Sequence, residues 1–159
     1  MHGRIKKLSG DLVIDLSHNR FEGPLPSISS NTLPLYLSNN MFSGSISQFL
    51  CNRPSDKMNL EILNLQNNQL SGVISNCWST MWKNLVILKV SDNKFNSTIP
   101  YSLGSLVLLW LLHLRNNNLS GELLVMKGQE MEYIENLGYV SSIDLSGEIP
   151  HGMGKMGAL

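Results

Sequence analysis

The segment EILNLQNNQLSGVIS, residues 61–75, decides the fold, because four other segments of the chain repeat its pattern without gaps. These copies are LVIDLSHNRFEGPLP at 12–26, LPLYLSNNMFSGSIS at 33–47, VILKVSDNKFNSTIP at 86–100 and WLLHLRNNNLSGELL at 110–124. All five share one asparagine: Asn19, Asn40, Asn68, Asn93 and Asn117. The intervals between these asparagines, 21, 28, 25 and 24 residues, are typical of proteins in which each repeat forms one coil.

Apolar residues stand at fixed distances from the shared asparagine, which predicts a core common to all repeats. Five and three positions before it stand Ile14, Leu35, Leu63, Leu88 and Leu112, and Leu16, Leu37, Leu65, Val90 and Leu114. Two and six positions after it stand Phe21, Phe42, Leu70, Phe95 and Leu119, and Leu25, Ile46, Ile74, Ile99 and Leu123. The alternation before the asparagine predicts one short strand per repeat, buried on one face.

The stacked repeats predict a right-handed solenoid whose parallel sheet forms the concave face. A glycine permits a turn after the strand in four copies, at Gly23, Gly44, Gly72 and Gly121, and Ser97 is the exception. The asparagine stands where the chain bends. We expect its amide to bond backbone groups of neighbouring coils that would otherwise be buried without partners.

The positions between the buried strand residues should line the concave sheet. They are Asp15, Tyr36, Asn64, Lys89 and His113, and Ser17, Ser38, Gln66, Ser91 and Arg115. Aromatic and arginine side chains are favoured anchors in interfaces. The candidate ligand-binding residues are therefore Tyr36, Asn64, Lys89, His113 and Arg115. A solvated sheet face without a particular role is the alternative interpretation.

Composition excludes several classes of function. Twelve basic and twelve acidic side chains give no electrostatic case for nucleic acid or an anionic membrane as a partner. The histidines lack metal-ligand spacing and the cysteines form no CxxC pair, so we expect no catalytic residues, metal or cofactor. The N-terminus has no apolar signal segment, and the apolar run 106–114 is shorter than the ~20 residues of a membrane helix. We expect neither an export signal nor a membrane segment in this chain.

The pattern LSxNxFxGxIP over residues 12–126 resembles the plant subclass of leucine-rich repeats. Its Gly-x-Ile-Pro element is clearest at 98–100 and 147–150. The resemblance implies the α/β horseshoe class, here largely β. More narrowly, SLGSLVLLWLLHLRNNNLSGEL, VMKGQEMEY and YVSSIDLS resemble plant receptor-like proteins of the disease-resistance type, including those that recognise fungal xylanase.

This resemblance implies a non-catalytic receptor at the extracellular side of the plasma membrane. Such a receptor binds a protein, peptide or glycan ligand and signals through a co-receptor kinase. The alternatives are an extracellular inhibitor of the polygalacturonase-inhibitor type and a truncated product without function. The segment KGQEMEY favours the receptor, because such inhibitors lack it.

The chain departs from the family at both ends. Residues 1–11 form a non-repeat N-terminal segment, and a charged linker at 127–138 follows the five repeats at 12–126. Residues 139–159 form a degenerate partial repeat and tail, in which the turn asparagine is missing. We interpret the chain as a shortened fragment of such a receptor.

Two cysteines and two glycosylation sequons bear on export. Cys51 lies eleven residues after Asn40 and Cys77 nine after Asn68, so both occupy similar phases of adjacent coils. The family resemblance implies export, and with it a disulfide; in a reducing compartment both cysteines would be buried thiols. The sequons at Asn96 and Asn118 are N-glycosylation candidates on the same condition.

Overall fold

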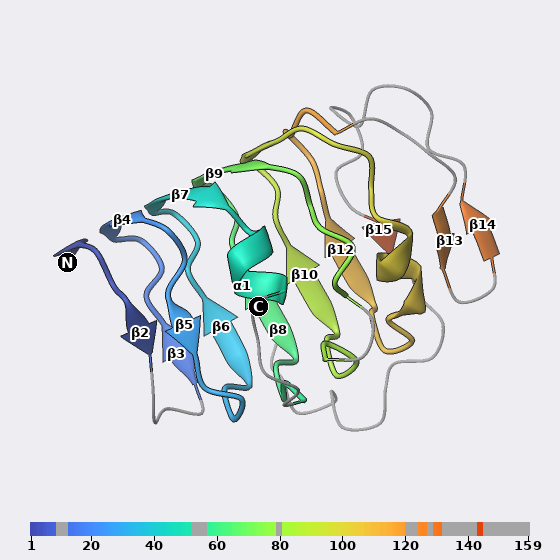
Figure 1. Cartoon of the computed structure of the whole chain (residues 1–159), viewed down its shortest axis with the longest axis horizontal. Helices are drawn as coiled ribbons and strands as arrows, with labels where there is room; N and C mark the ends of the chain where they lie inside the picture. The colour runs from blue at the N-terminus through green and yellow to red at the C-terminus, as the bar shows by residue number, and fades with distance from the viewer. Residues whose placement is uncertain are drawn as a thin grey trace.

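In a computed structural model the chain winds into successive coils that stack side by side (Figure 1). The structure describes residues 1–8, 13–51, 57–78 and 81–119, with the backbone alone of three short strands at 124–126, 129–131 and 143–144. Successive coils pair through two parallel sheets. The solenoid with a parallel sheet, predicted from the repeats, is therefore confirmed.

The first sheet contains one strand from each of the five predicted repeats. These strands are β3 (Ile14–Asp15), β6 (Pro34–Tyr36), β8 (Ile62–Asn64), β10 (Ile87–Lys89) and β12 (Leu111–His113). All four neighbouring pairs are parallel and join the same column of the repeat, as Leu35 with Leu63 or Leu88 with Leu112. The common register keeps every buried strand residue on one face of the sheet.

The sheet ends in a strand that does not follow the repeat. Strand β15 (Ile143–Asp144), from the predicted partial repeat at 139–159, pairs with β12 in the antiparallel direction. The parallel sheet predicted for the five repeats is confirmed, and β15 is an antiparallel addition at its edge. The partial repeat lacks the turn asparagine of the other coils. The rest of 139–159 lies outside the described residues.

The first four repeats also contribute a second strand each, which the sequence did not predict. The second sheet is parallel and contains β1 (His2–Gly3), β4 (Arg20–Gly23), β7 (Met41–Ser45), β9 (Gln69–Gly72) and β11 (Lys94–Phe95). In the strands that follow a turn asparagine, the residue two positions after the asparagine is buried. Gly44, two residues further along β7, has a φ of 87°. Residues that carry a side chain rarely adopt this left-handed backbone conformation. Where Ser97 replaces the glycine, β11 already ends at Phe95.

Short elements complete the coils away from the first sheet. They are a pair of parallel strands, β2 (Lys7–Leu8) with β5 (Ser27–Ile28), the helix α1 (Ser47–Cys51), the 3-10 helix η1 (Tyr101–Ser105) and the antiparallel pair β13 (Leu124–Met126) with β14 (Gln129–Met131). Residues 1–8 thus extend two sheets although their sequence lacks the repeat. Of the charged linker predicted at 127–138, only β14 lies within the described residues.

The core lies between the first sheet and the segments that cover it. The described residues of the predicted core columns are buried in the second to fifth repeats, with Leu35, Leu37 and Leu63 completely inaccessible to solvent. Leu16 and Leu25 are only partly buried, because their coil stacks on the short segment 1–8. Leu123 and Gly121 lie outside the described residues. The shared core confirms the predicted register.

The register generates a direct test in two adjacent residues. Leu88 is 1% exposed, whereas Lys89 points to the other face of β10. Leu88→Ala should lower the free energy of unfolding by about 2–5 kcal/mol, since it deletes buried methyl groups from the core. Lys89→Ala should change it by less than about 0.5 kcal/mol. Urea denaturation measures both values, and equal losses would show that the strand phase is displaced by one residue.

Candidate functional site

The asparagine turns fix the edge of the first sheet where its strands end. Asn68 is 8% exposed and lies between two coils. Its Nδ2 donates to the carbonyl oxygens of Leu65 and Gln66 in its own coil, at 3.1 and 3.3 Å, and to that of Leu37 in the preceding coil, at 3.0 Å. Its Oδ1 accepts from the backbone N–H of Phe42 at 3.0 Å. One amide therefore satisfies buried backbone groups of two coils.

The same hydrogen bonds recur along the solenoid and form an asparagine ladder. Asn40, Asn93 and Asn117 each donate to a carbonyl of the preceding coil and accept from its backbone N–H. Asn19 donates to Leu16 and Ser17 and accepts from the N-terminal ammonium at 2.7 Å. The ladder holds the turns, and with them the strands, in one register.

The residue before each ladder asparagine has a left-handed backbone, which the sequence analysis missed. These residues are His18, Asn39, Asn67, Asp92 and Asn116, with φ between 54° and 57°. Asn, Asp and His are the side chains that tolerate this region best, and all five copies carry one of them. Their side chains also bond across coils: Asn67 donates to Asn39 at 2.7 Å and Asn116 to Asp92 at 2.6 Å.

The outer face of the first sheet carries two rows of predicted binding residues. The first row contains Asp15, Tyr36, Asn64, Lys89 and His113, which are direct register partners from strand to strand. Asp15 is exposed and the other four are half-buried. The second row contains Ser17, Ser38, Gln66, Ser91 and Arg115, in which Ser38 bonds Ser17 at 3.1 Å and Arg115 is exposed. The structure therefore brings all five candidate ligand-binding residues onto one face.

An apolar row, which sequence reasoning missed, lies beside the first row. It contains Pro34, Ile62, Ile87 and Leu111, again in strand-to-strand register. Ile62 is only 3% exposed, yet it does not belong to the main core. Period-two alternation places each of these residues two positions before a member of the first row and on the same face. This alternation was the signal in the sequence that could have revealed the row.

Charge is distributed unevenly along the outer face. Asp15 and Tyr36 lie at its N-terminal end, where burial and then the Asp15 carboxylate raise the pKa of the Tyr36 phenol. Lys89, His113 and Arg115 lie at the opposite end. Burial, and then the Lys89 ammonium, lower the pKa of His113. The face therefore offers a neutral phenolic donor at one end and the basic side chains of Lys89 and Arg115 at the other.

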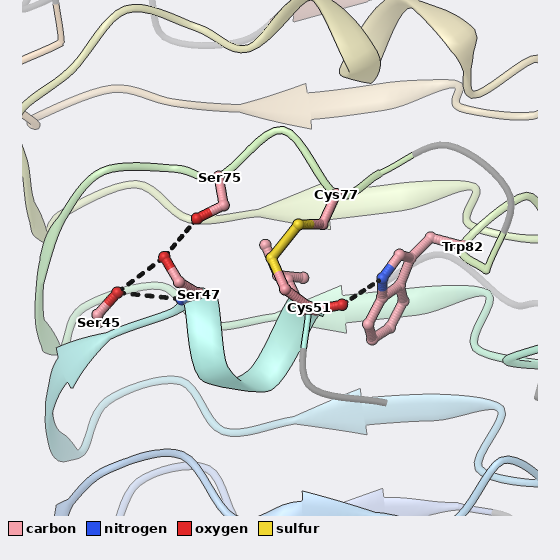
Figure 2. The surroundings of a disulfide bond; sticks show 7 residues. Ser45, Ser47, Cys51, Ser75, Cys77 and Trp82 are labelled. Carbon is pink, nitrogen blue, oxygen red and sulfur yellow. Dashed lines mark hydrogen bonds between the residues drawn. A yellow bond between two sulfur atoms is a disulfide. The ribbon is translucent and has the colours of Figure 1, made fainter. Parts of the chain in front are cut away.

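A disulfide joins two coils on the side of the core away from the first sheet (Figure 2). It links Cys51, at the end of α1, with Cys77 in the next coil, over a Cα–Cα distance of 5.5 Å. Beside it, Trp82 Nε1 donates to the carbonyl oxygen of Leu50 at 3.2 Å, and Ser47 hydrogen-bonds Ser75. Trp78 and Trp82 are completely buried here and belong to the core.

The remaining predicted residues bear on modification and cofactors. Asn96 and Asn118 are both exposed, and Asn118 donates its backbone N–H to Phe95, so the two sequons lie on adjacent coils. Within the described residues no three His, Cys, Asp or Glu side chains are grouped to hold a metal ion. No helix in the described part of the chain is long and apolar enough to cross a membrane.

Comparisons with known proteins match both the repeats and the solenoid. The family pattern described as Leucine Rich Repeat matches residues 12–32, 59–81 and 84–106. Receptor-like protein EIX2 of Solanum lycopersicum is 40% identical over 77 residues, which are 48% of this chain and 7% of that protein. The chain thus spans less than a tenth of the length of this relative.

Solved structures of plant receptors share the fold. The plant peptide hormone receptor RGFR1 in complex with RGF2 has a TM-score of 0.61 and 31% identity, over 77% of this chain and 20% of that one. The Arabidopsis receptor kinase HAESA, in complex with the peptide hormone IDA and the co-receptor SERK1, has a TM-score of 0.57 and 26% identity, over 75% of this chain and 20% of that one.

The disulfide should contribute measurably to stability. It closes a loop between residues 26 apart, and a cross-link of this span stabilises by about 3 kcal/mol, mainly through the unfolded chain. The double variant Cys51→Ala/Cys77→Ala should therefore lose about this amount in urea denaturation, and reduced wild type should match it. Thiol labelling of the chain exported from plant cells should find no free cysteine. Two labelled cysteines would contradict the disulfide.

Proposed function

The chain carries leucine-rich repeats of the plant receptor-like type, and from this premise we propose that it binds a protein or peptide ligand on the outer face of its first sheet. The observation that carries the proposal is the first row. Five side chains of different chemistry stand in strict register across five parallel strands and face solvent. A preformed, rigid array of this kind presents contacts to a ligand without the cost of ordering a loop.

The five repeats act as an internal comparison that supports this proposal. The core columns keep their chemistry from copy to copy, as Leu35, Leu63 and Leu88 do. The first row changes at every strand, from Asp15 through Tyr36 to Lys89. A shared scaffold that carries a variable face is typical of solenoids that bind partners. The function proposed is recognition without catalysis.

The partners and location are proposed from the receptors that the chain resembles. The HAESA structure holds a peptide hormone together with a co-receptor. We propose that the protein of which this sequence forms a part acts at the extracellular side of the plasma membrane, with a peptide or protein ligand and a co-receptor kinase. The chain spans only 7% of EIX2, so the location, the ligand and the co-receptor are proposed for the whole protein and are not read from this chain.

Export through the secretory pathway would also place glycans on Asn96 and Asn118. Both side chains are exposed, on adjacent coils beyond the strands of the first sheet. The oxidising pathway suits the Cys51–Cys77 disulfide as well. Peptide-N-glycosidase treatment that left the mass of the exported chain unchanged would contradict glycosylation at both sites.

A peptide-display experiment tests recognition by the outer face. The full chain, exported with its disulfide, is panned against a random dodecapeptide library, and fluorescence anisotropy measures the affinity of a selected peptide. Asn64→Trp should weaken binding at least tenfold, since it places a large side chain in the centre of the first row. The control Gln69→Trp, at an exposed site on β9, should leave the affinity unchanged. Absence of any selected peptide, or insensitivity to Asn64→Trp, would refute the proposal.

A further inference from the structure

The N-terminal half of the outer face surrounds one aromatic side chain with polar groups. Tyr36 is the single Phe, Tyr or Trp residue in the three rows of this face. Its register partners are Asp15 on β3 and Asn64 on β8, and its neighbours along the chain on this face are Pro34 and Ser38. Asp15 and Asn64 are two strands apart, about 9.6 Å, so the phenol lies between them. We call Asp15, Tyr36 and Asn64 the tyrosine cluster.

The two flanking side chains are held in place, and each keeps a free polar atom. Asp15 Oδ1 accepts from the backbone N–H of Ser17 at 2.9 Å, and Asn64 Oδ1 accepts from that of Gln66 at 3.2 Å. Within the described chain, Asp15 Oδ2 and Asn64 Nδ2 have no hydrogen-bond partner, and neither does the Tyr36 hydroxyl. Side chains that are already fixed lose little conformational freedom when a ligand binds. The tyrosine cluster therefore offers a preorganised acceptor, a donor and a phenol side by side.

Charge limits which ligands suit the tyrosine cluster. Asp15 is the single carboxylate in the three rows, and it is exposed. Lys89, the nearest cation of the first row, is three strands away, about 14 Å at the spacing of adjacent strands. The Tyr36 phenol stays neutral, because burial and then the Asp15 carboxylate raise its pKa. Asp15 would therefore repel an anionic ligand, whereas a neutral ligand meets no opposing charge.

Neutral hydroxyl groups match the free atoms of the cluster better than a cationic side chain does. A hydroxyl both donates and accepts, so neighbouring hydroxyls of one sugar ring can donate to Asp15 Oδ2 and accept from Asn64 Nδ2. A lysine or arginine side chain only donates, and it would leave Asn64 Nδ2 without an acceptor. The C–H groups of a sugar ring carry a slight positive charge, which suits the electron-rich face of an aromatic ring.

We infer that the tyrosine cluster is a binding site for a neutral oligosaccharide, with one sugar ring against Tyr36 and its hydroxyls bonded to Asp15 and Asn64. Ser17 adds a further donor beside the site, since its Oγ accepts from Ser38 at 3.1 Å and its own hydrogen is free. Both serines are small, so a neighbouring sugar unit has room on that side of Tyr36. The inference goes beyond the proposed function, because it adds a second class of ligand that does not depend on peptide binding.

Saturation-transfer NMR of the full chain, exported with its disulfide and then deglycosylated, tests the site. The neutral probes are tetrasaccharides of β-linked glucose, N-acetylglucosamine and xylose. Tetragalacturonate is the anionic comparison, and a tetra-arginine peptide is the cationic one. At least one neutral probe should bind with a Kd on the order of 0.1–1 mM, since one aromatic ring and a few polar atoms make the contacts. Tetragalacturonate should bind at least tenfold more weakly.

Variants locate the bound sugar on the outer face. Tyr36→Ala should weaken binding at least tenfold, whereas Tyr36→Phe keeps the ring and should bind within about threefold of wild type. Asp15→Asn keeps an oxygen for the Ser17 N–H but loses the charge, and it should weaken binding about threefold to tenfold. Tyr101→Ala is the matched control, because Tyr101 is 80% exposed on η1, and it should leave the affinity unchanged.

The outcomes separate this inference from the proposed function. The inference is overturned if no neutral probe binds at about 10 mM, or if tetragalacturonate binds as tightly as the best neutral probe. It is also overturned if Tyr101→Ala weakens binding as much as Tyr36→Ala, or if tetra-arginine binds through Asp15 while the sugars do not. Peptide selection that Asn64→Trp blocks would leave the proposed function intact in each of these cases. A sugar that binds through Tyr36 when no peptide is selected would support the inference alone.

Discussion

A buried asparagine amide between successive coils is the interaction on which the rest of the structure depends. Each coil must bend sharply after its strand, and the bend leaves backbone N–H and carbonyl groups inside the stack, away from water. Asn68 satisfies three carbonyls and one N–H in two coils with a single side chain. Because the same geometry recurs at Asn40 and Asn93, each coil positions the next. Register, core and outer face follow from this repetition.

The sequence predicted the parts of the fold that depend on side-chain periodicity. Leu63 and Leu88 were assigned to the core because their spacing from the asparagine repeats, and both are buried. The second strand escaped prediction, since a single buried residue per repeat marks it, such as Phe42 or Leu70, and alternation over so few residues is weak. The antiparallel β15 also could not be foreseen: its direction depends on which coil contacts it, and Ile143 and Leu145 would suit either direction.

The candidate site was predicted less completely than the core, for a related reason. Tyr36 and His113 were found as alternate residues of a strand, but the same alternation also brings Ile62 and Ile87 to the outer face. Apolar residues were assigned to the core by their type, and the sequence alone does not distinguish an apolar residue on the outer face from one inside. Ile62 shows the distinction only in the structure, where it is buried outside the main core. The solenoid thus separates a uniform scaffold from a face whose chemistry varies from strand to strand.

The most direct test of the asparagine ladder compares variants of two adjacent asparagines. Urea denaturation of the full chain measures the free energy of unfolding of each variant. Asn68→Ala removes the amide between coils and leaves the Phe42 N–H and the Leu37 carbonyl buried without partners. It should lower the free energy of unfolding by about 3 kcal/mol or more. Asn67→Gly keeps the left-handed backbone at a φ of 54° and should cost less than about 1 kcal/mol. Equal losses, or a larger loss at Asn67, would contradict the central role of the asparagine ladder.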